Sequence, residues 1–281
     1  MTVLSQRQIE KIISLVYQAG CMAVELRKGD GFVVSRKSDN SFVSNADIAI
    51  GDFLTNSLRV EFPDIAVICE ENFVEQQREN LFQVSDLYWS IDPIDGTSSF
   101  VNGGDDFAVS VALIKGNKAI FGIMHAPLFE GGKTVYMNHN QQVILVSANQ
   151  EKHLQNLSMC GEAIRLVISH RIKDNDLQLC LSWLQSVTNT TQPIVVEKIN
   201  SAVLKFLRVI EGKADIYLNL RPSMQWDSAA GQALLENLSG LVVAISNNDG
   251  QISLLDSLSC SKNDFSNPPF IATNSKICQK K

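Results

Sequence analysis

Apolar and polar positions follow a helical period over the first sixty residues. Six apolar residues between positions 5 and 28 lie at helical spacing: Ile9, Ile12, Ile13, Val16, Ala19 and Ala23. This spacing predicts one amphipathic helix that ends in the segment "GDG". A second helix is predicted from Ser44 or Asn45, which could cap it, to Pro63, which cannot continue it. The polar stretch 33–42 between these helices indicates an extended hairpin.

Later segments indicate strands and then mixed layers. Strand-like runs lie at 65–69, 87–91, 107–115 and 119–127. Gly116-Asn117 would join the last two as a hairpin, so a meander-like antiparallel sheet between helices is predicted. Beyond about residue 140, strands alternate with helices at 165–169, 176–187, 201–212, 214–220, 228–240 and 241–246. The alternation predicts α/β layering and two packed subdomains, 1–150 and 151–281.

Composition narrows the possible classes of protein. The chain has 281 residues, 45% of them hydrophobic, and a net charge of −6 without a Lys/Arg block, which argues against binding a nucleic-acid polymer. The six cysteines lie far apart, and no apolar run approaches the roughly 18 residues of a membrane span. The start lacks the pattern of a secretory signal. We therefore expect a cytoplasmic protein with reduced thiols and no membrane contact.

Acidic residues follow two predicted strands. Glu70 and Glu71 come directly after "IAVIC", and Asp92 comes after "LYWSI". Pro93 favours a turn that brings Asp92 and Asp95 toward one point. Two such carboxylates would repel each other, and a hard divalent cation such as Mg²⁺ would compensate. The alternative is a surface turn with solvated acids, and a single carboxylate at a strand end is usually a cap or turn former.

Two further features extend this hypothesis toward phosphate chemistry. Gly96-Thr97 opens a predicted short helix, whose first N–H groups could receive an anion. Asp227 lies just before the predicted helix 228–240, where it is a metal ligand or, alternatively, an N-cap. Metal ligands beside a phosphate-binding helix start indicate a site that cleaves or transfers phosphate.

Three segments together carry a resemblance to a known family. "CEEN" (69–72), "DPIDGTSSF" (92–100) and "WDSAAG" (226–231) resemble, in order and separation, the signature segments of inositol-monophosphatase-like, metal-dependent, lithium-sensitive phosphatases. The resemblance extends from the first helix to at least residue 245. It implies a five-layered αβαβα sandwich, with most metal ligands in the N-terminal half, and a possible homodimer.

The resemblance also assigns metal ligands. It implies that Glu70, Asp92 and the carbonyl oxygen of Ile94 hold one Mg²⁺. Asp92, Asp95 and Asp227 would hold a second ion, and Glu70 could help to place a third. Two or three Mg²⁺ ions are therefore expected.

The same resemblance implies the catalytic groups. Gly96 and Thr97 would receive the phosphate through backbone amides. Thr97, hydrogen-bonded to Asp47, would orient and help deprotonate the metal-bound water that attacks phosphorus in line, and Glu70 is the third catalytic candidate. No Ser–His or Cys–His nucleophile is required, so the four histidines are taken as structural or surface groups.

Within the family, two segments resemble the 3′(2′),5′-bisphosphate nucleotidase branch: 35–47 and 204–231. This branch implies hydrolysis of adenosine 3′,5′-bisphosphate to AMP and phosphate. Lys37 would lie near the metal site, Lys205 would bind the second phosphate, and Arg221 is a further candidate contact. The alternatives are a solvated loop lysine for Lys37 and the outer face of an amphipathic helix for Lys205.

The chain departs from that branch where substrate is discriminated. Phe42 and Ser44 replace proline and threonine, Ser98 stands in place of lysine, and Asn219 stands in place of arginine, with Arg221 two positions later. Two other readings are therefore kept. One is an inositol or sugar monophosphatase, and the other is a catalytically silent metal-binding or interaction module of the same fold.

Overall fold

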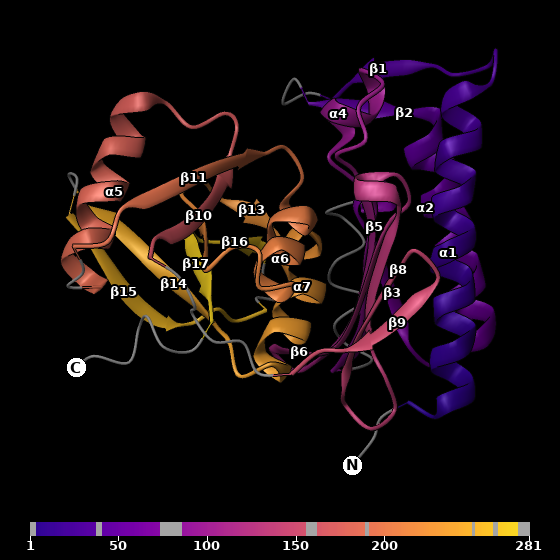
Figure 1. The fold of residues 1–281 in the computed structure, drawn as a ribbon. Coiled ribbons are helices and arrows are strands. Elements are labelled where there is room, and N and C mark those ends of the chain that lie inside the picture. The colour runs from indigo at the N-terminus through magenta and orange to yellow at the C-terminus, as the bar shows by residue number, and fades with distance from the viewer. Residues whose placement is uncertain are drawn as a thin grey trace.

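Five layers of helix and sheet are stacked across the molecule (Figure 1). The structure is a computed structural model that describes residues 4–37, 41–73, 86–155, 162–188, 191–248, 251–260 and 264–274. Helices α1 (Gln6–Lys28) and α2 (Asn45–Glu61) cover one face of a seven-stranded sheet, and α6 (Ala202–Ile210) and α7 (Gln225–Asn237) cover the other. A six-stranded sheet and α5 (Asp174–Thr188) follow. The predicted αβαβα sandwich is confirmed.

The seven-stranded sheet has the strand order β3-β4-β5-β6-β7-β8-β9. Its strands are β3 (Ala66–Cys69), β4 (Leu87–Asp95), β5 (Ala108–Lys115), β6 (Lys118–Ala126), β7 (Lys133–Met137), β8 (Val143–Ser147) and β9 (Gln150–His153). Strands β4 to β9 pair antiparallel, whereas β3 pairs parallel to β4. The predicted antiparallel meander is thus wrong for its first strand, and β7, β8 and β9 were not predicted.

The six-stranded sheet has the order β11-β10-β12-β17-β14-β15. Its strands are β10 (Ile164–Ser169), β11 (Ile194–Ile199), β12 (Ile216–Asn219), β14 (Leu241–Asn248), β15 (Gln251–Ser257) and β17 (Phe270–Thr273). β10 pairs parallel with β11 on one side and with β12 on the other. The chain therefore leaves β10 through α5 to one neighbour and returns through α6 to the other.

Side-chain alternation along these strands separates two buried clusters. Val167, Tyr217 and Phe270 face α6 and α7 and join a continuous core that reaches α1 through the large sheet. Their strand neighbours Leu166 and Ile216 pack on the opposite face with α5. Because one core spans both sheets, the two halves of the chain are packed as one body. Strand β9 crosses the predicted 150/151 division, and the second sheet begins at β10.

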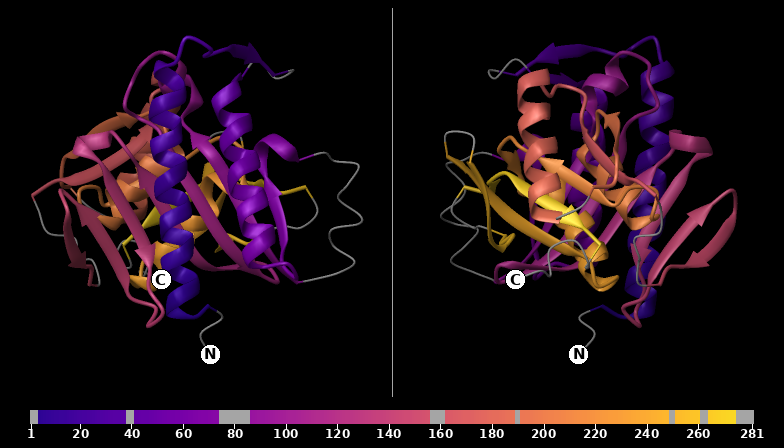
Figure 2. Two further views of the ribbon diagram at one scale, coloured as in Figure 1. Left: turned by 90° about the vertical axis from the view of Figure 1, so that its right-hand side faces the viewer. Right: turned by 60° about the vertical axis from the view of Figure 1, so that its left-hand side comes forward.

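Helix α1 illustrates how the predicted periodicity becomes packing. Ser5 caps the helix and forms a capping box with Gln8, and five of the six apolar positions named above are buried, Ile13 lying partly exposed. Figure 2 shows α1 and α2 side by side over the large sheet. No helix in the described ranges is long and apolar enough to cross a membrane.

Smaller elements frame the site between the layers. They are β1 (Val34–Arg36), β2 (Phe42–Ser44), α4 (Thr97–Val101), the 3-10 helices η1 (Glu70–Asn72) and η3 (Phe129–Gly131), β13 (Ser223–Met224) and β16 (Ser266–Asn267). β1 and β2 form the predicted hairpin, with residues 38–40 outside the described ranges. Gly122 lets α7 lie directly on β6, since a Cβ there would be 2.4 Å from the Ala230 carbonyl oxygen.

Two local predictions are corrected. The segment around Pro93 is a bulge within β4 and not a turn, because Asp92 pairs with Ser110 and Asp95 pairs with Ala108. Proline is tolerated there because the bulge interrupts the hydrogen-bond ladder. Asp227 lies within the first turn of α7 and not before the helix, which begins at Gln225.

Candidate active site

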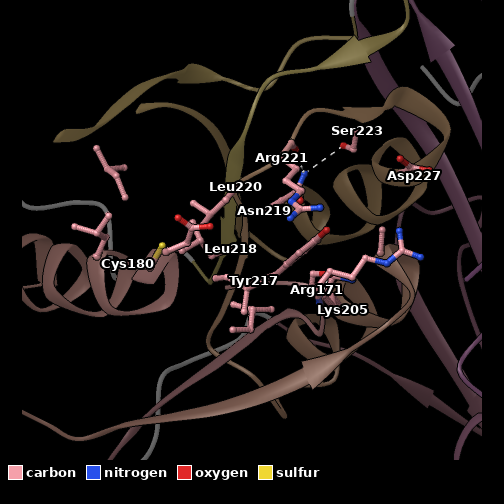
Figure 3. Close-up of a pocket in the computed structure, with 17 residues that line it drawn as sticks. Arg171, Cys180, Lys205, Tyr217, Leu218, Asn219, Leu220, Arg221, Ser223 and Asp227 are labelled. Carbon is pink, nitrogen blue, oxygen red and sulfur yellow. Dashed lines mark hydrogen bonds between the residues drawn. The ribbon is translucent and has the colours of Figure 1, made fainter. Parts of the chain in front are cut away.

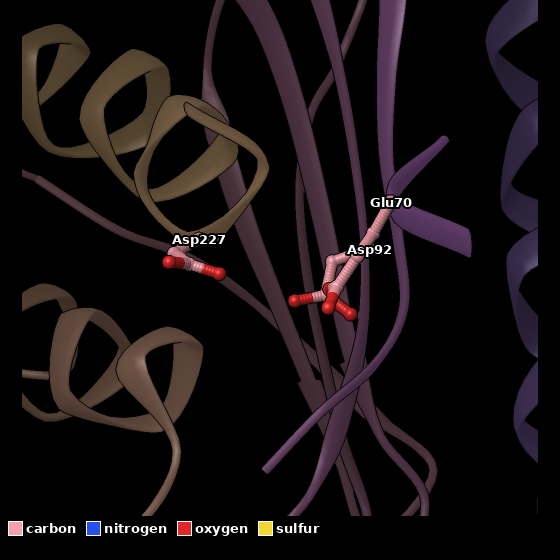
Figure 4. Close-up of side chains that lie close together, drawn as sticks. All are labelled: Glu70, Asp92 and Asp227. Atoms are coloured by element: carbon pink, nitrogen blue, oxygen red, sulfur yellow. The ribbon is translucent and has the colours of Figure 1, made fainter. Parts of the chain in front are cut away.

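Three carboxylates from distant parts of the chain converge at one point. Glu70, Asp92 and Asp227 each offer an oxygen atom within 4.8 Å of the others. Cys69 pairs with Ile91 in the parallel β3–β4 register, so Glu70 and Asp92, which follow these residues, emerge at the same edge. Asp227 reaches them from the start of α7 (Figure 4). These predicted metal ligands are brought together.

Burial makes the ionised form of this cluster unfavourable when no cation is bound. It raises the pKa of Asp92 well above the usual value, and the charges of Glu70, Asp95 and Asp227 raise that pKa further. The pKa of Asp227 is raised for the same reasons, by burial first and then by Asp95 and Glu70. A hard divalent cation would relieve this repulsion, and an all-oxygen donor set suits Mg²⁺. The residues present therefore fit the expected metal.

The bulge in β4 orients the residues between the two aspartates. The Ile94 N–H donates to Asp92 Oδ1 at 3.0 Å, and the Thr97 hydroxyl lies 3.0 Å from the Ile94 carbonyl oxygen. The same hydroxyl lies 3.3 Å from Asp47 Oδ1. Since a hydroxyl has one proton to donate, it can serve only one of these acceptors at a time. The predicted Thr97–Asp47 pair is present.

Asp47 is buried near the start of α2 and held from the other side. Its Oδ2 accepts the Ser44 N–H at 2.8 Å and also the Ser44 hydroxyl, and the Asp47 N–H donates to Ser44 Oγ at 3.4 Å, which completes a capping box. Burial raises the pKa of Asp47, although the bonds from Ser44 oppose this, and the charge of Glu70 raises the pKa further. A raised pKa makes this carboxylate a better proton acceptor than a solvated aspartate.

Asp95 differs from the other predicted ligands. It lies outside the group of three, and its Oδ2 accepts the Val203 N–H at 2.6 Å and the Ser201 hydroxyl. Both donors lie at the start of α6, in the other half of the chain. Asp95 nevertheless lines the same cleft as the cluster. Ser201 was not predicted, although a serine ahead of the apolar run 202–210 is a helix-start signal.

Gly96 is required by the local backbone. Its φ is +91°, a left-handed conformation that glycine adopts without strain, and a Cβ would lie 2.4 Å from the Asp106 carbonyl oxygen. Gly96 and Thr97 line the cleft at the start of α4. The predicted phosphate contacts therefore lie beside the carboxylates.

Lys37 is paired with the acidic residues after β3. Its Nζ lies 2.8 Å from a carboxylate oxygen of Glu70 and 2.8 Å from one of Glu71. Burial alone would lower the pKa of Lys37, but these two carboxylates raise it above the usual value. The solvated-loop alternative is therefore wrong, and the neighbours of Lys37 are carboxylates at the predicted metal site.

Two cavities meet at the site. We call the first the acidic cleft; it has a volume of about 280 Å³ and is lined by Ser41, Phe42, Glu70, Asp92, Ile94, Asp95, Gly96, Thr97, Ser98, Ser169, Arg171, Asn200 and Asp227. The second, the C-terminal pocket, has a volume of about 360 Å³ and lies among α5, α6 and the ends of β10 and β12 (Figure 3). Ser169, Arg171 and Asp227 line both cavities.

The predicted substrate contacts Lys205 and Arg221 both line the C-terminal pocket. Lys205 is buried, so the outer-face alternative is wrong. Its ammonium donates to the carbonyl oxygens of Ile199, Asn200 and Ser201, the last at 2.7 Å. Burial lowers its pKa to about 8, which Asp95 and Asp227 oppose. Arg221 is exposed at the rim.

Sequence reasoning missed Arg171, which lines both cavities. A signal was available, because Arg171 stands two residues after the predicted strand 165–169, and strand ends in α/β sheets carry ligand contacts. The position of Arg171 after a strand therefore indicates a ligand contact, which its residue type alone would not indicate.

Comparison with known proteins identifies the family to which the chain belongs. The model of the inositol monophosphatase family matches residues 5–280. The chain belongs to the inositol monophosphatase family. Members of the inositol monophosphatase family are metal-dependent phosphatases, so the chain is an enzyme that hydrolyses phosphoric monoesters.

Individual proteins of the inositol monophosphatase family are similar to this chain in sequence or in structure. A 3′(2′),5′-bisphosphate nucleotidase CysQ of Salmonella typhimurium is 30% identical over 227 residues, covering 80% of this chain and 86% of that protein. The crystal structure of CysQ from Bacteroides thetaiotaomicron gives a TM-score of 0.74 at 19% identity, covering 96% of this chain and 98% of that one. A LiCl-soaked inhibitory complex of staphylococcal inositol monophosphatase-1 gives 0.71 at 19% identity, covering 99% and 93%. The two structures share the fold.

Proposed function

We propose that the chain is a Mg²⁺-dependent 3′(2′),5′-bisphosphate nucleotidase that hydrolyses adenosine 3′,5′-bisphosphate to AMP and phosphate. One observation carries this proposal: the acidic cleft opens beside a second pocket lined by the cations Arg171, Lys205 and Arg221. The cleft suits metal ions and the phosphate to be cleaved. The second pocket suits the remainder of a substrate that keeps another phosphate. The relationship to CysQ nucleotidases supports the same choice.

Five groups of this chain would hold the metal. Glu70, Asp92 and the Ile94 carbonyl oxygen would bind one Mg²⁺, and Asp92, Asp95 and Asp227 would bind a second. Divalent ions bound there would neutralise phosphate charge, activate a water molecule and stabilise the leaving oxygen. Asp92 is central, because it is buried and interacts electrostatically with each of the other carboxylates.

Thr97 and Asp47 would take up the proton that the attacking water loses. When the Thr97 hydroxyl donates to Asp47, its oxygen is free to accept a hydrogen bond from water in the cleft. The buried Asp47 carboxylate can then accept the Thr97 hydroxyl proton as the Thr97 oxygen takes a proton from the water. The backbone amides of Gly96 and Thr97, which line the cleft at the start of α4, would receive the phosphate.

The C-terminal pocket would hold the nucleoside. Its walls combine the apolar side chains of Leu179 in α5, Ile252 in β15 and the loop residues Ile172 and Leu220 with the cations Arg171, Lys205 and Arg221. Such a mixture is typical of pockets that bury a small organic ligand and orient it through a few polar groups.

A substrate panel tests the proposal. The protein, with Mg²⁺, is assayed for phosphate release from adenosine 3′,5′-bisphosphate and from inositol 1-phosphate. We expect a kcat/KM at least about tenfold higher for the bisphosphate, loss of activity with a chelator, and inhibition by lithium. A preference for inositol 1-phosphate would support the inositol monophosphatase alternative. No Mg²⁺-dependent release from any phosphomonoester would revive the silent module.

The proposal also covers the cellular location and the oligomeric state of the protein. We propose a cytoplasmic enzyme, which the unpaired thiols among the described cysteines support: Cys21, Cys69, Cys180 and Cys260. A homodimer is proposed from the family resemblance, and sedimentation of the purified protein at micromolar concentration distinguishes it from a monomer.

A further inference from the structure

Arg171 lies at the point where the smaller sheet reverses its strand order. β10 is flanked by the parallel strands β11 and β12: α5 connects β10 to β11 on one side, and α6 connects β11 back to β12 on the other. In open α/β sheets, ligands bind in the crevice beyond the carboxyl ends of the strands at such a reversal. Arg171 follows the carboxyl end of β10 by two residues, so the fold itself puts this side chain where a ligand is expected.

The charges around the acidic cleft make Arg171 distinctive. Four carboxylates line the cleft, from Glu70, Asp92, Asp95 and Asp227. Arg171 is the only cationic residue among the described residues that line it. Arg171 also lines the C-terminal pocket, where Figure 3 shows its side chain, so this residue is shared by the two cavities.

Two other polar residues that line the pocket, Lys205 and Asn219, are already engaged within the protein, and Arg221 does not line the acidic cleft. The Lys205 ammonium donates to three backbone carbonyls, which matches its three protons. The Asn219 amide donates to the Arg221 carbonyl oxygen at 2.8 Å and approaches the Ser223 hydroxyl at 3.3 Å. In contrast, the Arg171 guanidinium forms no hydrogen bond or ion pair within the described part of the chain, and only its backbone N–H donates, to Ser169 Oγ at 3.2 Å.

A guanidinium without a protein partner is suited to a phosphate. Its planar fork can donate two parallel hydrogen bonds to a phosphate, and bonds between charged groups are stronger than neutral ones. The carboxylates of the cleft would bind Mg²⁺ and, with it, the phosphate to be cleaved. A second phosphate on the same small molecule would then face the junction of the cavities.

We propose that Arg171 binds the phosphate that is not cleaved and thereby selects a bisphosphate over a monophosphate substrate. This inference rests on the proposed nucleotidase function. Arg171 acts here as a specificity-determining residue, since it contacts the spectator phosphate and takes no part in the attack on phosphorus. It is contributed by the C-terminal half, whereas most of the predicted metal ligands come from the N-terminal half.

The test compares Arg171→Gln with wild type on two substrates that differ by one phosphate, adenosine 3′,5′-bisphosphate and adenosine 3′-monophosphate. For the bisphosphate we expect KM to rise at least about tenfold, equivalent to about 1.4 kcal/mol, with kcat changed less than about threefold. For the monophosphate both constants should stay within about threefold of wild type. Arg171→Lys should restore part of the lost affinity, because it keeps the charge without the fork.

A matched control separates contact from general electrostatics. Lys173 is exposed in the same loop and lines neither cavity, so Lys173→Gln removes one charge nearby and should leave KM for the bisphosphate within about twofold. Equal rises in KM for both substrates, or equal effects of Arg171→Gln and Lys173→Gln, would overturn the inference. Wild-type protein that fails to hydrolyse the bisphosphate would remove the proposed function and this inference with it.

Discussion

Replacing Asp92 by asparagine should abolish turnover and yet stabilise the metal-free protein. Asp92 is buried against three other carboxylates, and its pKa is raised well above the usual value. Asparagine has nearly the same shape, and its side-chain oxygen can still accept the Ile94 N–H that Asp92 accepts at 3.0 Å. The substitution therefore removes charge from the cluster while preserving the bulge in β4.

The size of the stabilisation follows from the geometry. Two unit charges no more than 4.8 Å apart repel by about 3 kcal/mol or more at an effective dielectric constant of about 20. The same repulsion keeps part of the cluster protonated, so we expect a net gain of about 1–2 kcal/mol in the metal-free protein. For a chain of this size, that corresponds to a rise in Tm of roughly 2–8 °C.

The pH dependence has a definite sign. Because the folded-state pKa of Asp92 is raised above its unfolded value, ionisation of Asp92 opposes folding above about pH 4. Metal-free wild type should therefore gain stability from this group as the pH falls from 7 toward 4. Asp92→Asn should show a flatter dependence over that range.

The assay combines turnover with thermal unfolding, each with and without Mg²⁺. For Asp92→Asn we expect kcat to fall by at least about 10³-fold and the rise in Tm that Mg²⁺ gives the wild type to disappear. Asp30→Asn, at an exposed position with no neighbouring carboxylate cluster, is the control and should behave as wild type. Retained turnover, or a lower metal-free Tm with an undiminished Mg²⁺ effect, would refute the assignment of Asp92.

Three further substitutions test other parts of the structure. Thr97→Val removes the hydroxyl shared by Asp47 and the Ile94 carbonyl oxygen, so kcat should fall about 10²-fold or more with KM nearly unchanged in steady-state assays. Gly96→Ala should lower the free energy of unfolding, measured by urea titration, by about 2–4 kcal/mol. The added Cβ would collide with the Asp106 carbonyl oxygen at a positive φ. An unchanged urea midpoint would contradict the left-handed conformation of Gly96. Burial would raise the pKa of Glu130, but bonds from Lys133, Lys213 and Arg208 lower it to about 2. The ionised Glu130 carboxylate therefore stabilises the folded state above about pH 4.5, and this stabilisation is lost toward pH 2. Glu130→Gln should remove that part of the pH dependence of the free energy of unfolding.

The elements and residues that the sequence predicts well depend on local pattern. Helix α1 is predicted because its apolar period and its start at Ser5 lie within one segment. Glu70 and Asp92 are predicted because each directly follows an apolar strand. Their convergence with Asp227 could be expected only through the resemblance to a family, since periodicity does not specify which strand ends meet.

The remaining features depend on packing between distant segments. Pro93 suggests a turn from its own chemistry, but the pairing of β4 with β5 on both sides of it makes the segment a bulge. The bond from Ser201 to Asp95 joins residues 106 positions apart, and the approach of Arg171 to the cleft needs both sheets in place. Such contacts carry no periodic signal, so the sequence alone does not reveal them.

The division of the three converging carboxylates between the two halves has a consequence for the timing of activity during synthesis. Glu70 and Asp92 leave the ribosome well before Asp227, which lies in one of the last helices of the chain. With the metal ligands proposed above, a nascent chain that has formed only the large sheet would hold an incomplete set of ligands and would not hydrolyse phosphate esters. Hydrolytic activity would then begin only once α7 has docked, so activity would report that the two halves of the chain have come together.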